Sequence, residues 1–289
     1  LSLLSIGPEI AATKLWGSGA ITATLSYMNL KPYMELVPQY YEWKKAPEST
    51  SAAISIRQKT GKTGMLKVYG SFDNSNFTLA QTDLDLDKLI NYNLNNKNYF
   101  VNSSWKILVG KNTTFTTSAS LTSDNDIVAY ENNAFEKRNR GVHLKEVVAK
   151  EINSKTTLRI GAEWMMNSFD QYWQSAADTV EMNYANHNLA AFAEAELYAS
   201  KRFVTRLGLR AEHSSYLDRF NIAPRLTAAY KLNETSQFSV AYGWFHQNPG
   251  HEFMVYTSQT DFERADHYTL SYQSSKNERT FRAEVYYKD

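Results

Sequence analysis

The chain has 289 residues, a formal net charge of +1 at pH 7, 21% charged residues and no cysteine. The balanced charge gives no indication of a nucleic-acid partner, and the missing cysteines exclude disulfides, thiolate metal sites and thiol catalysis within this chain. Apolar runs stay well below about eighteen residues and the mean hydropathy is −0.50, which excludes a helix bundle in lipid; a transmembrane barrel remains possible, because half of each barrel strand faces water.

Alternation of apolar and polar residues with a period of two predicts about fourteen β-strands. In chain order, they are expected over residues 9–16, 20–28, 49–58, 64–72, 99–108, 113–121, 140–152, 156–172, 187–200, 201–213, 221–232, 236–246, 266–274 and 279–288.

The hairpin over residues 187–213 shows the alternation best. Leu197 and Leu207 belong to its apolar face, whereas Glu196 and Arg206 belong to its charged face. Its arms have about ten to twelve residues, roughly twice the usual length of a soluble strand and close to what crosses a tilted bilayer core. Strand length is therefore a first indication of a membrane protein.

The connections alternate between short and long, which is a second indication. Turns of about two to five residues are expected near 17–19, 59–62, 110–111, 153–154, 233–234 and 275–277. Long connections are expected over 29–48, 73–97, 122–139, 173–186 and 247–264. Short periplasmic turns and long extracellular loops are typical of an antiparallel up-and-down transmembrane β-barrel.

Charged residues also keep to one phase of the expected strands. Arg159 and Glu163 share a face, as do Arg282, Glu284 and Lys288, and the opposite faces are apolar. A barrel has strong reason to keep this phase, because arginine or lysine facing lipid at the bilayer midplane costs about 2–4 kcal/mol. Glu146 breaks the rule by sharing a phase with apolar neighbours, so we expect a β-bulge near it.

Several segments resemble a known family, and the resemblance is densest from Asn221 onward. The segments are Asn221–Arg225, Tyr242–Pro249, Ala265–Tyr268 and Arg282–Lys288, with Leu25–Tyr33 and Trp43–Pro47 earlier in the chain. Their order and spacing resemble the barrel of TonB-dependent outer-membrane receptors of the Bacteroidetes type.

The resemblance implies a receptor in the bacterial outer membrane with a barrel of about twenty-two strands and a plug domain inside it. Residues 1–289 would then be a single β-barrel region of a larger receptor, without its plug. The implied partners are outer-membrane lipid, the receptor's own plug, the TonB complex, and a small-molecule or glycan ligand such as a siderophore or vitamin. The implied function is active uptake of a nutrient, with no enzymatic reaction and no cofactor.

Five residues are candidates for lining a ligand site, because the strand directions place them on the lumen phase near the extracellular mouth. They are Asn221, Arg225, Phe245, Gln247 and His267. A wide barrel leaves an aqueous interior where polar and aromatic groups converge on a ligand. Contact with the plug or with neighbouring strands is the alternative role of these residues.

Two other groups of residues do not form convincing sites. His246, His251 and His267 lie near Asp261, Glu263 and Asp266, but their spacing matches no metal-ligand pattern. His213, Ser214 and Asp218 lack the strand, elbow and helix around a serine that a hydrolase needs. We therefore expect neither a metal site nor a catalytic site.

Two other functions stay open at this point. A passive porin-like channel would share the barrel but would have no plug. A soluble β-sandwich for binding or adhesion would also alternate apolar and polar residues, with its apolar face packed on a second sheet. Coordinates that show the side of Leu207, Ile222 and Val285 packed in a dry core would favour the sandwich.

Overall fold

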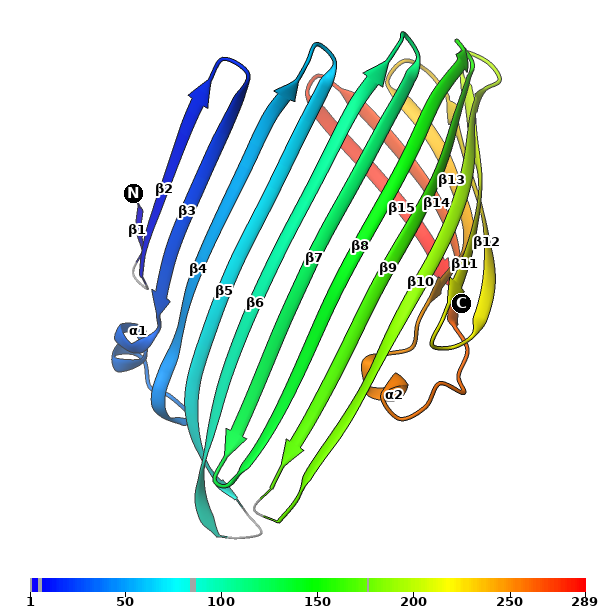
Figure 1. Ribbon diagram of the computed structural model, residues 1–289. Helices are drawn as coiled ribbons and strands as arrows, with labels where there is room; N and C mark the ends of the chain where they lie inside the picture. The colour runs from blue at the N-terminus through cyan, green and yellow to red at the C-terminus, as the bar shows by residue number, and fades with distance from the viewer. Residues whose placement is uncertain (1, 5–6, 84–86, 176) are drawn as a thin grey trace. The chain divides into compact units, whose positions relative to one another are not determined.

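A computed structural model describes residues 2–4, 7–83, 87–175 and 177–289 as a chain built almost entirely of strands. The strands follow one another in chain order in one fifteen-stranded sheet (Figure 1). They are β1 (Ser2–Leu4), β2 (Gly7–Trp16), β3 (Gly19–Asn29), β4 (Glu42–Thr60), β5 (Gly64–Asp83), β6 (Lys88–Val109), β7 (Thr113–Tyr130), β8 (Asn133–Asn153), β9 (Thr156–Gln174), β10 (Thr179–Tyr198), β11 (Phe203–Ser214), β12 (Arg219–Lys231), β13 (Ser236–Gln247), β14 (Glu263–Lys276) and β15 (Arg279–Lys288). Two short helices lie between strands, α1 (Lys31–Leu36) and α2 (His251–Met254).

The predicted strands are confirmed as an antiparallel up-and-down sheet. Fourteen of the fifteen strands correspond to the fourteen expected from the sequence, and the additional strand is the three-residue β1. Within β2–β5 and within β10–β15, each strand pairs antiparallel with the next strand in the chain.

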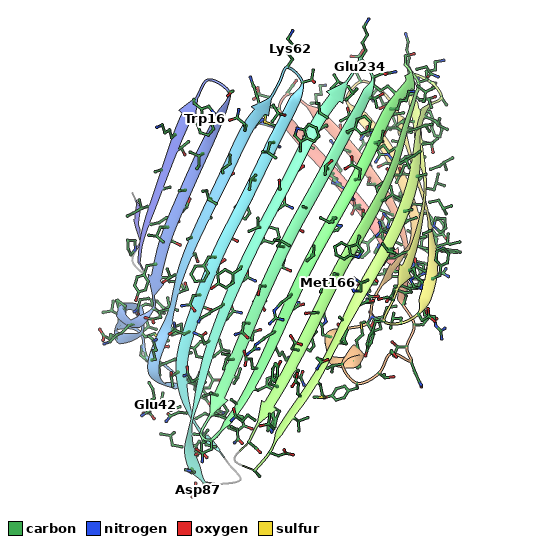
Figure 2. The ribbon with its side chains drawn as sticks, in the orientation of Figure 1. Trp16, Glu42, Lys62, Asp87, Met166 and Glu234 are labelled. Atoms are coloured by element: carbon green, nitrogen blue, oxygen red, sulfur yellow. The ribbon has the colours of Figure 1, made fainter. Side chains whose placement is uncertain are left out.

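The chain divides into two compact units. Unit 1 comprises Leu1–Trp105, Ser118–His143 and Met166–Ala185, and unit 2 comprises Lys106–Thr117, Leu144–Met165 and Asn186–Asp289. In unit 1, Trp16 and Lys62 lie at the ends of strands that short turns connect, whereas Glu42 and Asp87 lie at the opposite ends (Figure 2). The Trp16 indole nitrogen donates a 2.8 Å hydrogen bond to Gln58, which ties neighbouring hairpins together at the short-turn end.

The expected bounds of three long loops are wrong. Segments 73–97, 122–139 and 173–186 are mostly strand, because β5 runs to Asp83, β7 to Tyr130 and β10 starts at Thr179. These segments are rich in polar residues on both faces, so they lack the apolar phase that identified the other strands. Their backbone groups can still pair across neighbouring strands in water, so the strands extend further than the apolar pattern. The connections before β4 and before β14 are long, as predicted.

Register is interrupted in β4, where shifts occur between Trp43 and Lys45 and between Lys45 and Glu48. The bulge expected near Glu146 stays a prediction. Strand β8 is assigned without a break over that residue, and Glu146 accepts a hydrogen bond from the Thr117 hydroxyl.

The soluble sandwich is contradicted by the arrangement of the sheet. The strands form a single sheet, and the side chains of Leu207, Ile222 and Val285 are 48%, 48% and 73% exposed. Among the described residues, many more large apolar side chains are exposed than buried. Within the described ranges no helix has the length and apolar character needed to cross a membrane.

Candidate functional site

Four of the five predicted ligand-lining residues lie together on one face of β12, β13 and β14, in unit 2. Backbone pairing sets Arg225 opposite Gly243 and Gly243 opposite His267, so these residues point to the same side. Phe245 and Gln247 follow Gly243 at intervals of two and share that side. We call the group Arg225, Phe245, Gln247 and His267 the candidate wall.

The Phe245 ring is the centre of the candidate wall. The Arg225 guanidinium lies over it, 4.6 Å from the ring centre, and the His267 ring lies 4.5 Å from it, centre to centre. Gly243 permits this packing, since a Cβ at that position would lie 3.2 Å from Arg225 Cγ and 3.2 Å from Phe245 Cε2. A Cβ at this position would require the arginine or the ring to shift by a few tenths of an ångström.

A recess of about 320 Å³ lies at the Gln247 end of the candidate wall. Gln247 closes one side of it by donating a 2.6 Å hydrogen bond from Nε2 to Glu263 Oε2. The recess is lined by Phe245, His246, Gln247, Glu263, Arg264, Ala265, His267, Lys288 and Asp289. Such a mixture of one aromatic ring with converging polar groups is typical of small-ligand sites.

Arg225 and Asn221 are not among the residues that line the recess, and Asn221 also lies outside the candidate wall. It shares the face of Arg225 but lies four residues away on β12, about 13 Å along the strand. It pairs with Glu212 on β11, and its Nδ2 atom is buried with no hydrogen-bond partner among the described residues.

Glu263 and Lys288 belong to the recess but were not predicted from the sequence. Lys288 lies opposite His267 in the register of β14 and β15, and Glu263 lies opposite Gln247. Among the described residues, neither Arg225 nor Lys288 has a carboxylate partner. The two-residue phase of Arg282 and Glu284 predicts that Lys288 lies on the polar face, but only the register places this lysine beside His267.

The same face of β9, β10 and β11 carries two networks of charged side chains. In the first, Glu163 is 9% exposed and pairs with Lys145 at 2.6 Å and with Arg210 at 3.1 Å. Arg210 also pairs with Glu212 at 2.9 Å. The Glu163–Arg210 pair joins β9 to β11 across β10, and Lys145 joins it from β8, so the predicted charged phase of these strands corresponds to one continuous polar face.

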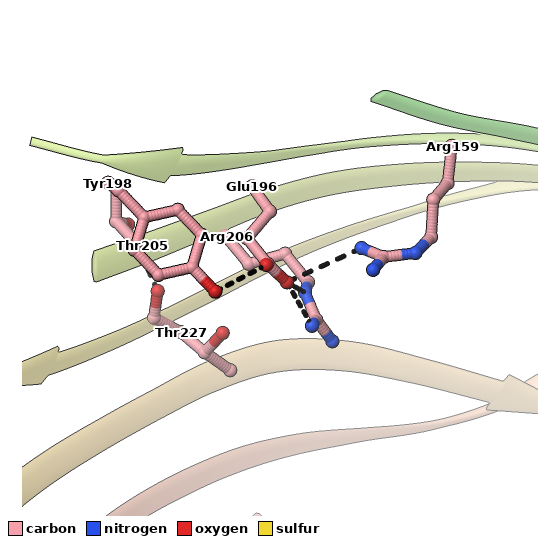
Figure 3. Close-up of polar contacts among 6 residues, drawn as sticks. All are labelled: Arg159, Glu196, Tyr198, Thr205, Arg206 and Thr227. Carbon is pink, nitrogen blue, oxygen red and sulfur yellow. Dashed lines mark hydrogen bonds and ion pairs between the residues drawn. The ribbon is translucent and has the colours of Figure 1, made fainter. Parts of the chain in front are cut away.

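The second network is centred on Glu196 (Figure 3). Its carboxylate accepts hydrogen bonds from Arg206 and, at 3.0 Å, from the Tyr198 hydroxyl. Arg159 on β9 approaches the same carboxylate at 3.4 Å. One acid is thus shared by two arginines from the two flanking strands.

The opposite face of β12 to β15 is apolar and arranged in rows. An aliphatic row contains Ala228, Val240, Leu270 and Val285, which lie opposite one another in register, and Leu226 lies beside the row, opposite Tyr242. On one side of the row Tyr268 contacts Tyr242 at 4.8 Å and Tyr287 at 6.0 Å between ring centres. On the other side Tyr272 contacts Phe238 at 5.0 Å and Phe281 at 6.4 Å. An apolar band between aromatic girdles is the outer surface of a membrane barrel.

The two groups of residues that the sequence analysis set aside do not come together as sites. Ser214 donates its hydrogen bond to Asn186 at 2.9 Å, while His213 lies 3.5 Å from Asp218. Over the described part of the chain, no cluster of three or more histidine, aspartate or glutamate side chains has an arrangement that could hold a metal ion.

Comparison with known proteins agrees with this two-faced sheet. A family model described as TonB dependent receptor-like, beta-barrel, matches residues 22–289. A comparison with curated protein sequences finds no match.

Three solved structures illustrate the similarity of fold. The ferric yersiniabactin uptake receptor of Yersinia pestis is 11% identical with a TM-score of 0.69, covering 97% of this chain and 51% of that one. The ferric-catecholate import receptor of E. coli is 10% identical with a TM-score of 0.72, covering 98% of this chain and 57% of that one. The RagAB peptide importer is 10% identical with a TM-score of 0.69, covering 97% of this chain and 43% of that one.

This chain spans about half the length of each of those structures. At this low sequence identity the three structures show a similarity of fold alone, whereas the family model covers nearly all of the chain. The chain therefore belongs to the TonB-dependent receptor-like β-barrel family, whose members lie in the bacterial outer membrane.

Proposed function

We propose that residues 1–289 form one barrel region of a receptor that takes up a nutrient by TonB-dependent active transport. The observation that carries the proposal is the division of the sheet into an apolar face with aromatic rows and a polar face with shared charges. The apolar face contacts lipid, and the polar face encloses the transport path together with a plug domain. The TonB complex then supplies the energy that rearranges the plug.

The candidate wall contacts the nutrient on its way into the barrel. Arg225 and His267 flank an exposed aromatic ring, so the wall offers hydrogen-bond donors and a stacking surface, and Phe245 and His267 also line the recess. Asn221, further along β12, extends the same wall. Chemistry of this kind suits a ligand with aromatic or conjugated groups and polar atoms, such as a siderophore, a vitamin or a glycan.

Whole-cell uptake by the full-length receptor tests the proposal. The receptor is produced in a bacterial host with and without a working TonB complex, and growth is measured with a ferric catecholate as the only iron source and, separately, with short peptides. Uptake that requires TonB supports active transport. Uptake of the same size without TonB would instead identify a passive channel.

Variants of the candidate wall test its role in the same assay. Arg225→Ala and Phe245→Ala each remove one side of a cation–π pair worth about 0.5–2 kcal/mol, so we expect uptake at limiting nutrient to fall by roughly twofold to thirtyfold. Arg282→Ala is the matched control, because Arg282 is an arginine on the polar face of β15 whose ion pair is with Glu284. Equal effects of the wall variants and the control would show that the wall does not contact the nutrient.

A further inference from the structure

The loop between β13 and β14 is held to the rest of unit 2 at its middle. It covers residues 248–262, and the residues at its two ends, Gln247 and Glu263, are hydrogen-bonded to each other. Inside the loop, Met254 is only 1% exposed and its carbonyl oxygen accepts a 2.6 Å hydrogen bond from the Tyr216 hydroxyl. Tyr216 belongs to the turn between β11 and β12, so that turn is the support on which the loop rests.

The turn is itself held by the side chain of Asn186, which is 1% exposed. Asn186 Oδ1 accepts hydrogen bonds from the Ser214 hydroxyl at 2.9 Å and from the Tyr216 backbone N–H at 3.0 Å. The Ser215 hydroxyl donates to the same oxygen at 3.4 Å. One buried amide oxygen therefore fixes three consecutive residues of the turn.

The turn is also bonded to the backbone of His187: the Ser215 N–H donates to the His187 carbonyl at 3.0 Å, and the His187 N–H donates to Ser215 Oγ at 2.9 Å. Asn186 Nδ2 donates to Asn188 Oδ1 at 3.2 Å, and the Leu217 backbone N–H donates to Ser214 Oγ at 3.4 Å. Ser214 is fully buried and Leu217 is 4% exposed. Because burial makes each of these polar atoms dependent on its partner, loss of the Asn186 oxygen would leave several donors unsatisfied at once.

The outer side of the same loop presents two aromatic side chains. Phe253 and Tyr256 are 59% and 69% exposed, although they neighbour the buried Met254 and Val255. The loop thus has a buried anchor on one side and an exposed aromatic surface on the other. Arg219 on β12 also lies 4.0 Å from Asp261 of the loop, and both of these side chains are exposed. Loops with few buried apolar contacts belong to the parts of a protein that open at low free-energy cost.

We propose that Asn186 is a positioning residue that acts as a latch for loop 248–262. Asn186 orders the turn, and the turn presents the Tyr216 hydroxyl that bonds to the Met254 carbonyl. With the latch formed, the aromatic pair and the ends of β13 and β14 stay in one arrangement. The loop begins after Gln247 and ends before Glu263, and both residues line the candidate recess. An effect of the latch on ligand entry therefore rests on the proposed function.

Spin labelling of the full-length receptor tests the latch, since these 289 residues contribute no cysteine of their own. A nitroxide at Tyr256→Cys reports loop motion, and one at Glu234→Cys, in the short turn before β13, reports general loosening of the unit. In Asn186→Ala and in Tyr216→Phe, we expect the mobile fraction at position 256 to rise by roughly tenfold, as expected for one lost buried hydrogen bond. The label at position 234 should not change.

Asn188→Ala is the matched control, because Asn188 is 3% exposed on the same face of β10 and contacts the Nδ2 atom of Asn186, not its oxygen. The latch is overturned if position 256 stays immobile in both test variants, if Asn188→Ala mobilises it equally, or if position 234 loosens in parallel. Tyr216→Phe keeps the proposal testable if Asn186→Ala does not fold. Loop release with unchanged uptake would uphold the latch and remove only its link to the nutrient.

Discussion

Replacing Leu270 by arginine gives the sharpest test of which face of the sheet meets lipid. Leu270 is 50% exposed and lies opposite Val240 on one side and Val285 on the other, in the aliphatic row. Arginine at the bilayer midplane costs about 2–4 kcal/mol. The aromatic rows lie two residues away in each direction, about 7 Å along the strand, and the flexible arginine stem can carry its charge toward an interface. We therefore expect a cost at the lower end, about 2 kcal/mol, or a roughly thirtyfold shift of the unfolding equilibrium.

Thr269→Arg is the control for this experiment. Thr269 precedes Leu270 on β14, lies opposite Ala241 and Tyr286, and points to the polar face. An arginine there stays in water, so the expected change is within about 0.5 kcal/mol. The assay is equilibrium urea unfolding of the full-length receptor in phospholipid vesicles, followed by tryptophan fluorescence. Equal costs for the two variants, or a larger cost at Thr269, would refute the assignment of the faces.

Three further variants test other parts of the sheet. Gly243→Ala places a Cβ 3.2 Å from Phe245 Cε2, so we expect reduced uptake in whole cells. Gly208→Ala is the control and should transport normally, because the nearest atom to its added Cβ lies at 3.4 Å. Equal uptake by the two variants would argue that the packing of Arg225 on Phe245 does not matter for transport. Glu196→Gln leaves Arg159 and Arg206 without the carboxylate that they share. Because both arginines are partly exposed, we expect the free energy of unfolding in urea to fall by about 1 kcal/mol. An unchanged free energy of unfolding would show that the network does not contribute to stability. Glu146→Leu removes an exposed acid from an apolar phase and should raise stability by roughly 1 kcal/mol in vesicles, so a loss would indicate a role for its bond to Thr117.

Strand number and the assignment of faces could be predicted from the sequence because both depend on local alternation. Arg159 and Glu196 were each placed on a charged phase, and the structure joins them across neighbouring strands. The candidate wall follows from the same rule, since Arg225, Phe245 and His267 each lie on the polar phase of their strand.

What the sequence could not provide is the register between strands and the extent of strands in water. Lys288 lies opposite His267 only because β15 pairs with β14 in one particular register, and no pattern in the sequence predicts that register. The outer parts of β5 and β6 were missed because Asn and Asp lie on both faces there, which removes the contrast on which strand assignment depends. Asn186 was missed for another reason: its importance depends on a turn that lies about thirty residues later in the chain.

The fixed pairing of β13 between β12 and β14 also limits how this protein can change in length. Deleting one residue from the middle of β13 would turn every later side chain of that strand to the other side, so that Phe245 and Gln247 would face the acyl chains and Trp244 the aqueous interior. Deletions of two residues preserve the sides, and additions in loop 248–262 leave the pairing untouched. Among related sequences, differences in length should therefore occur mainly in the loops, and within strands they should be of two residues or a multiple of two.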